Sequence, residues 1–284
     1  MTTTLEEVKK FNLQNISKMR GGITNNPVTI QEKLRWLSIY DIPWSDTYNM
    51  PLKSVCTDKL LVKEYLKNLL GTDICVPTIA VYNNTKEINW DKLPNKFIIK
   101  VNHNSGGTII CRDKNLFDKT SCISKLNYWM NDDFTFRNGF ESHYHWIDRK
   151  IMVEELLEDE TQKESLFDYK FLCFNGEPKF CQVFGNRRTP NFYLNYYDMD
   201  FNFVDISRKD IRNKSSIKNT APKNFGLMKH YAKTISENFK FVRADFYEVN
   251  GMVYLGELTF TPGVNMFDYV NPEDNKKIGN LLKI

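Results

Sequence analysis

The sequence predicts an α+β fold in which short strands, several of them joined as hairpins, are interspersed with a few helices. Runs rich in Ile, Val, Phe and Tyr with period-two alternation recur along the 284 residues. Asn-Gly pairs at 175–176 and 250–251 each stand between two such runs and are typical of tight turns. Hairpins join antiparallel strands, so this pattern disfavours a doubly wound parallel sheet.

The composition is that of an ordinary globular protein, with 41% hydrophobic and 26% charged residues. Lys and Arg number 39 against 35 Asp and Glu, and the net charge of +4 does not suit a nucleic-acid binder. No apolar run approaches the roughly 20 residues of a membrane helix, and the first residues lack a signal-peptide stretch. Six widely spaced cysteines without a CxxC pair favour reduced thiols over disulfides or zinc. We therefore expect a cytoplasmic protein without an integral membrane segment.

The first 55 or so residues are predicted to be helical and then irregular. Ile30, Leu34 and Leu37 fall on one face of a helix over 29–40, which ends before Pro43.

A second helix is predicted over 58–70, because Thr57 can cap its start and Gly71 stands where a C-terminal cap belongs. Three lysines at i, i+4 spacing form a row that is typical of a solvated helix face, and they are Lys59, Lys63 and Lys67.

The β pattern dominates the rest of the chain. Strands are predicted, in order, over 76–82, 96–103, 108–112, 151–157, 168–174, 179–184 and 192–197. Further helices are predicted over 121–130 and 225–238. The polar, Lys- and Arg-rich stretch 205–223 is predicted to be an exposed loop.

The last hairpin, 239–263, separates polar from apolar side chains when its loop has three or five residues. In that register Asp245 faces Glu257 and Arg243 faces Thr259, whereas a strict two-residue turn puts the two carboxylates on opposite faces. Carboxylates so close are unfavourable unless a cation or a proton lies between them. Mg²⁺ usually takes one or two carboxylates plus substrate phosphates. The alternative is an exposed hairpin in which Arg243 forms only surface ion pairs.

A small-residue loop follows the strand that carries Lys100. Its backbone N–H groups can face a polyphosphate, with Lys100 as a point charge; the loop residues are Ser105, Gly106 and Gly107. It is not a Walker-type P-loop, and a Gly-Gly pair between strands is more often only a turn. Because no GxSxG or Cys/His motif supports nucleophilic catalysis, lysines, a small loop and acidic residues must carry the function, which indicates phosphates.

The order of these elements resembles the ATP-grasp superfamily. The D-alanine–D-alanine ligases end in a similar Glu-x-Asn-x-x-Pro-Gly signature, here the segment 257–263. Three motifs look more closely like the TupA-like (teichuronopeptide biosynthesis) branch, namely Lys100-Val-Asn-His-Asn-Ser-Gly, Asp168-Tyr-Lys-Phe-Leu-Cys-Phe-Asn-Gly and Glu257-Leu-Thr-Phe-Thr-Pro-Gly. The resemblance spans about residues 30–270. It implies an ATP-grasp fold with two α+β lobes clasping ATP: a mainly helical segment 1–57, a small lobe 58–153 and a large lobe 154–284.

The resemblance also implies a role for each candidate on the nucleotide side. Lys59 and Lys100 contact the phosphates of ATP, and the loop Ser105, Gly106 and Gly107 closes over them. A hinge reads adenine, partly through backbone groups, and its residues are Glu154, Glu155 and Leu157. Asp168 or Lys170 reaches the ribose or the phosphates.

On the catalytic side, the resemblance implies that Asp245 and Glu257 hold Mg²⁺ and that Arg243 faces the acyl phosphate or the oxyanion. Thr259 stands where the ligases have a metal-binding Asn. Since a hydroxyl is a poorer Mg²⁺ ligand than an amide oxygen, either one metal site is weak or Asn265 or water completes it.

The implied activity is that of an ATP-dependent carboxylate–amine ligase. It would act through an acyl phosphate on a small-molecule or saccharide carboxylate and an amine, for instance a uronic acid in capsular polysaccharide biosynthesis. Two alternatives remain: a kinase that phosphorylates a sugar hydroxyl, and a nucleotide-binding protein without catalysis.

Overall fold

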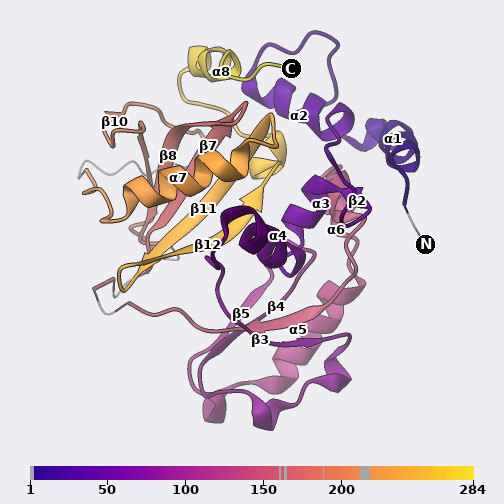
Figure 1. The fold of residues 1–284 in the computed structure, drawn as a ribbon, viewed down its shortest axis with the longest axis vertical. Helices are drawn as coiled ribbons and strands as arrows, with labels where there is room; N and C mark the ends of the chain where they lie inside the picture. The colour runs from indigo at the N-terminus through magenta and orange to yellow at the C-terminus, as the bar shows by residue number, and fades with distance from the viewer. Residues whose placement is uncertain (1–2, 160, 163–164, 188, 212–217) are drawn as a thin grey trace.

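The computed structural model describes residues 3–159, 161–162, 165–187, 189–211 and 218–284. It contains a six-stranded and a four-stranded antiparallel sheet with helices packed against both (Figure 1). The predicted α+β class is confirmed, and the predicted strands are present within a few residues of their expected bounds.

The larger sheet has the strand order β10-β9-β8-β7-β11-β12. Its strands are β7 (Asp168–Phe174), β8 (Glu177–Gly185), β9 (Tyr193–Tyr197), β10 (Phe203–Val204), β11 (Phe241–Val249) and β12 (Met252–Thr259). The turn between β7 and β8 is the predicted Asn-Gly pair, in which Asn175 and Gly176 both have positive φ.

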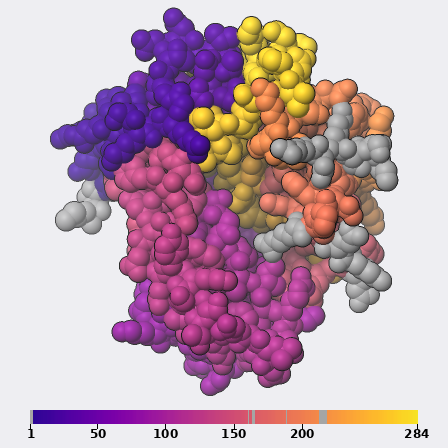
Figure 2. All heavy atoms as spheres, turned by 180° about the vertical axis from the view of Figure 1, so that it is seen from behind, coloured from indigo at the N-terminus to yellow at the C-terminus, as the bar shows by residue number. Residues whose placement is uncertain are grey.

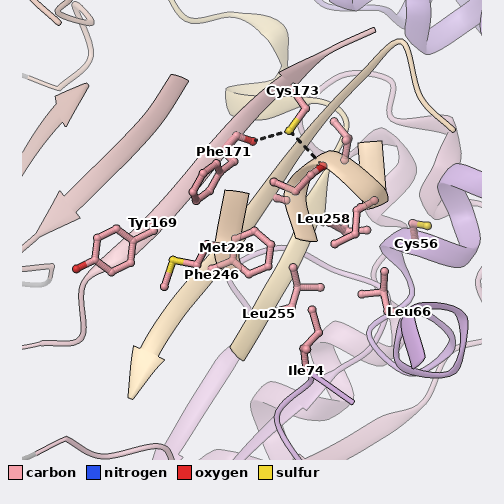
Figure 3. Packing of buried hydrophobic residues seen from close by; sticks show 14 of the residues in the cluster. Cys56, Leu66, Ile74, Tyr169, Phe171, Cys173, Met228, Phe246, Leu255 and Leu258 are labelled. Atoms are coloured by element: carbon pink, nitrogen blue, oxygen red, sulfur yellow. Dashed lines mark hydrogen bonds between the residues drawn. The ribbon is translucent and has the colours of Figure 1, made fainter. Parts of the chain in front are cut away.

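The largest hydrophobic cluster lies between this sheet and three helices, α3 (Leu52–Thr57), α4 (Leu61–Leu70) and α7 (Phe225–Ser236). Phe171 and Phe246 pack there edge-to-face, 5.6 Å between ring centroids, beside Met228 of α7 (Figure 3). All six cysteines are buried and free. The opposite face of the sheet is covered by α2 (Ile30–Tyr40) and α8 (Pro272–Gly279).

The smaller sheet has the order β3-β6-β4-β5. Its strands are β3 (Thr78–Tyr82), β4 (Phe97–Val101), β5 (Thr108–Cys111) and β6 (Ile151–Glu154), and α5 (Lys119–Asn131) packs against it. The predicted strand over 151–157 ends early, and its last residue, Glu154, pairs with Ile98 inside this sheet.

The first helices differ from expectation at one cap. After α1 (Leu5–Gln14), α2 begins at a capping box formed by Thr29 and Glu32. Thr57 does not cap the next helix, because it is the last residue of α3; the Asp58 carboxylate accepts the Leu60 N–H at 2.8 Å instead. Helix α4 therefore begins later than predicted, and it ends as predicted at Gly71, with φ 68°.

The short elements include β1 (Trp44–Ser45), β2 (Met50–Pro51), α6 (Phe134–Arg137) and the 3₁₀ turns Ser142–Tyr144 and Pro262–Asn265. Within the predicted exposed loop 205–223, residues 212–217 lie outside the described part. Near the start of this stretch, Arg208 is buried: it is paired with Asp210, and its guanidinium lies 4.7 Å from the ring centroid of Phe267. The N-terminal end of the predicted loop is therefore held against the rest of the protein. No helix in the described ranges is long and apolar enough to cross a membrane.

Candidate active site

The last hairpin has the predicted cross-strand pairs. Asp245 lies opposite Glu257, and Arg243 lies opposite Thr259. On its other side β11 pairs with β7, which sets Lys170 opposite Asp245. Polar side chains from three adjacent strands therefore gather on one face of the sheet.

The structure reaches this register through a two-residue turn and a β-bulge, and not through the predicted loop of three or five residues. Asn250 and Gly251 form a two-residue turn with φ 51° and 77°, and Val249 pairs with Met252 across it. The extra residue is in a β-bulge, at the register shift between Asp245 and Phe246. Gly256 stands at this irregularity, where an added Cβ would come 2.6 Å from a ring carbon of Tyr247.

Arg243 lies among the candidate metal ligands. Its Nε and Nη2 each donate to the Asp245 carboxylate at 2.6 Å, and Nη2 also donates to Glu257 and to Thr259 at 2.9 Å. This bidentate contact is strong because the Asp245 side chain is 1% exposed and that of Arg243 only 11%. Among the described residues, no hydrogen bond comes from Nη1.

Lys170 and Asp168 extend this cluster along β7. The Lys170 ammonium is paired with Asp245 and lies 3.6 Å from Asp168, which is itself paired with Arg187. The buried Asp168 Oδ1 atom has no partner in the part of the chain that the structure describes. Arg187 was missed by sequence reasoning, because it follows the end of β8 without any motif.

The charges of this cluster shape the ionisation of Glu257, whose side chain is 40% exposed. Burial raises its pKa, but the cations Lys170, Arg243 and Lys59 outweigh that effect and lower the pKa to about 2. Glu257 is therefore an anion at neutral pH.

Lys59 lies between the two sheets. Its ammonium donates to the backbone carbonyl oxygens of Asn102, at 3.4 Å, and of Asn104. Burial and then the charge of Lys100 lower the pKa of Lys59 to about 8, while Glu257 acts in the opposite direction. Lys59 is thus close enough to Lys100 of the small sheet and Glu257 of the large sheet to interact with both.

Glu154 lies at the end of β6 and holds two lysines. Lys63 contacts one carboxylate oxygen at 2.6 Å, and Lys100 contacts the other. Lys63 also donates to the Thr78 hydroxyl at 2.6 Å. The prediction of a solvated lysine row is therefore wrong for Lys63, because its ammonium is engaged by Glu154 and Thr78. Lys67 is exposed as predicted.

The other nucleotide-side candidates lie around these lysines. Glu155 is exposed and its N–H donates to the Pro77 carbonyl at 3.1 Å, while Leu157 is half-buried. In the loop, Ser105 and Gly106 are exposed.

Gly107 is buried against the Asn104 side chain, which a Cβ on Gly107 would overlap. Asn104 is 2% exposed, and neither polar atom of its side-chain amide has a partner among the residues that the structure describes.

Two antiparallel sheets with helices packed against each, one carrying Lys100 and the other the facing Asp245 and Glu257, are the arrangement that the resemblance to ATP-grasp proteins implied. The family model for the TupA-like ATP-grasp proteins matches residues 32–283, so the chain belongs to that family. No curated protein sequence matches the chain.

The solved structures that are similar to the chain at low identity include two D-alanine–D-alanine ligases. The D-alanine–D-alanine ligase of Bacillus anthracis, complexed with ATP, is 16% identical with a TM-score of 0.42, covering 81% of this chain and 61% of the ligase. The Helicobacter pylori enzyme is 16% identical with a TM-score of 0.45, covering 89% and 69%. The chain thus spans about six tenths of the Bacillus ligase.

Proposed function

We propose that the protein is an ATP-dependent carboxylate–amine ligase that activates a sugar acid as an acyl phosphate and joins it to an amine in surface polysaccharide biosynthesis. Membership of the TupA-like ATP-grasp family supports the ligase class. The single observation that carries the proposal is the facing pair Asp245 and Glu257, with Lys59 near enough to shift the ionisation of Glu257.

In this proposal the phosphates of ATP bind where positive charge and backbone N–H groups converge. Lys59 and Lys100 supply the charge, and the exposed loop residues Ser105 and Gly106, with Gly107, supply N–H groups. Adenine binds at the hinge of Glu154, Glu155 and Leu157, and the ribose binds toward Asp168 or Lys170. The lobes meet at this hinge in our proposal, with the small lobe over 58–153 and the large lobe over 154–284. Helix α4, near the start of the small-lobe range, nevertheless packs in the core of the six-stranded sheet.

The donor set of the hairpin fits Mg²⁺ when substrate phosphates complete it. Asp245, Glu257 and Thr259 offer only oxygen atoms, which this hard cation prefers. Within the described residues no group of three or more His, Cys, Asp or Glu side chains forms a metal cage by itself. When bound, Mg²⁺ would neutralise charge on the β- and γ-phosphates.

The chain's own residues then position and stabilise the reacting groups. Lys170 and Arg243 hold the buried Asp245 carboxylate in place, and their charges act against the burial that raises its pKa. Because Nε and Nη2 of Arg243 are held by Asp245, its Nη1 is oriented for the oxyanion that forms when the amine attacks the acyl phosphate.

Isotope tracing with an ¹⁸O-labelled carboxylate tests the proposal, once a screen of uronic acids and amines has found a pair that releases ADP. A ligase transfers one labelled oxygen to the released phosphate. Arg243→Ala should lose about 10²–10³ in amide formation while ATP affinity stays within a few fold, and Arg243→Lys should rescue poorly because a point charge replaces a planar fork. Product without that oxygen transfer, with the phosphate retained on a hydroxyl, would identify a kinase instead.

A further inference from the structure

Glu141 is a buried carboxylate that no motif singled out. It lies between α6 and β6, in the segment around residue 140 that is pink in Figure 2 and reaches the indigo N-terminal part. Its side chain is paired with the Thr261 hydroxyl, which donates to Oε1, and the residue is 5% exposed. Among the described residues no basic side chain pairs with it. A buried carboxylate without a cation is unfavourable, so the site is suited to a cationic ligand.

The position of Glu141 adjoins the candidate catalytic hairpin. Thr261 follows Thr259, the last residue of β12, by two positions. Tyr144 is near enough to both groups for their charges to act on it: burial raises its pKa, and the charges of Glu141 and Glu257 raise it further. Val264 in the turn after Thr261 lies against Gly139, where an added Cβ would be 3.6 Å from its methyl group.

Two acceptors that have no partner among the described residues belong to the same contact between segments 135–142 and 261–265. Thr135, whose carbonyl accepts the Glu141 N–H at 2.9 Å, has a buried hydroxyl without a partner. Asn265 donates to the Ser38 hydroxyl at 3.3 Å, while its Oδ1 has no partner. Both residues are 1% exposed. A ligand that donates several hydrogen bonds and carries positive charge matches this set, and a primary ammonium does so.

We infer that Glu141 binds the ammonium form of the amine co-substrate and takes its proton, an assignment that rests on the proposed function. The carboxylate accepts one proton from R–NH₃⁺, which gives R–NH₂ and protonated Glu141. The amine lone pair then forms the C–N bond to the acyl carbon, and the C–O bond to phosphate breaks with its electron pair. The second proton leaves with the phosphate as HPO₄²⁻, and Glu141 returns its proton to water.

The ionisation of Glu141 is compatible with this role. Burial raises its pKa to about 7, although the Thr261 hydrogen bond acts against that rise. The titratable side chains nearby are Tyr144 and His143, and Lys53 acts on His143. A base with a pKa near the working pH is effective in proton transfer.

The binding arm of the test uses methylammonium chloride as the probe and the Thr261 methyl NMR signal as the readout. We expect a saturable shift of this signal in the wild type, its loss in Glu141→Gln, and its retention in Glu177→Gln, an exposed control carboxylate. Shifts that are equal in wild type and Glu141→Gln, an absent shift, or the same saturation by potassium chloride would overturn the assignment.

The chemical arm compares methylamine with hydroxylamine, which is uncharged near neutral pH and needs no base to become nucleophilic. Uronic acids with ATP serve as acceptors. Glu141→Gln should keep hydroxamate formation within a few fold and lose about 10²-fold or more with methylamine; equal losses with both would overturn the inference. If the wild type forms no hydroxamate, the proposed ligase function fails, and the NMR arm still decides the amine site.

Discussion

Replacing Glu141 with Gln should change how the stability of the protein depends on pH. The ordinary pKa of a glutamate is 4.5, and burial raises that of Glu141 to about 7. Between these values the folded state binds more protons than the unfolded state, so this group's contribution to stability is complete below about pH 4.5 and is lost as the pH rises through about 7. A difference of about 2.5 pH units at 1.36 kcal/mol each amounts to about 3 kcal/mol.

Urea unfolding of wild type and Glu141→Gln between about pH 5 and pH 8 measures this term. The stability of the variant relative to the wild type should rise by up to about 3 kcal/mol over that range, because Gln keeps the acceptor for Thr261 without a charge. His143, whose pKa burial lowers to about 3, and Tyr144, whose pKa burial raises, do not titrate there. Glu177→Gln is the control and should run parallel to the wild type. A parallel curve for Glu141→Gln would refute the reasoning.

Three further outcomes follow from the site and the hairpin. ATP affinity should fall as the pH rises above about 8, because the charge of Lys59 is lost there, and Lys59→Arg should abolish the fall in calorimetry; an unchanged pH profile would contradict this. Gly256→Ala should cost about 1–3 kcal/mol in thermal unfolding, because its Cβ meets Tyr247, whereas Gly226→Ala, with open space around it, should not. Backbone hydrogen exchange in 105–107 should slow when ATP binds, and equal exchange with and without ATP would count against the phosphate loop.

The register of the last hairpin could be predicted from the sequence because alternation reports directly on faces. Leu258 and Phe260 mark the apolar side, and the carboxylates fall on the other. The alternation shows only that the segment between Asp245 and Glu257 has one residue more than a regular hairpin with a two-residue turn would have. It does not say whether that residue lies in the turn or in a bulge, and the close approach of Tyr247 to Gly256 is a tertiary contact.

The ion pairs of the site could not be predicted, because their partners are distant along the chain. Lys63 stands in a regular lysine row, and nothing local distinguishes it from Lys67, yet it pairs with Glu154. Glu141 and Thr261 are 120 residues apart, and Glu141 stands in a stretch without any motif. Only the three-dimensional packing of the segment 135–142 against the end of β12 brings these two side chains together.

The bulge at Gly256 makes the facing pair Asp245 and Glu257 tolerant of one change in chain length and intolerant of another. Deleting Gly256 removes the extra residue, and a regular hairpin with the same Asn-Gly turn then still sets the glutamate opposite Asp245. Inserting one residue into β12 before Glu257, with the turn and the bulge kept, instead moves the glutamate to the other face of the sheet. A change in length within these strands therefore keeps the pair only if the bulge takes up the extra residue or is lost together with it. A family member that is one residue shorter here can keep the same pair by having no bulge.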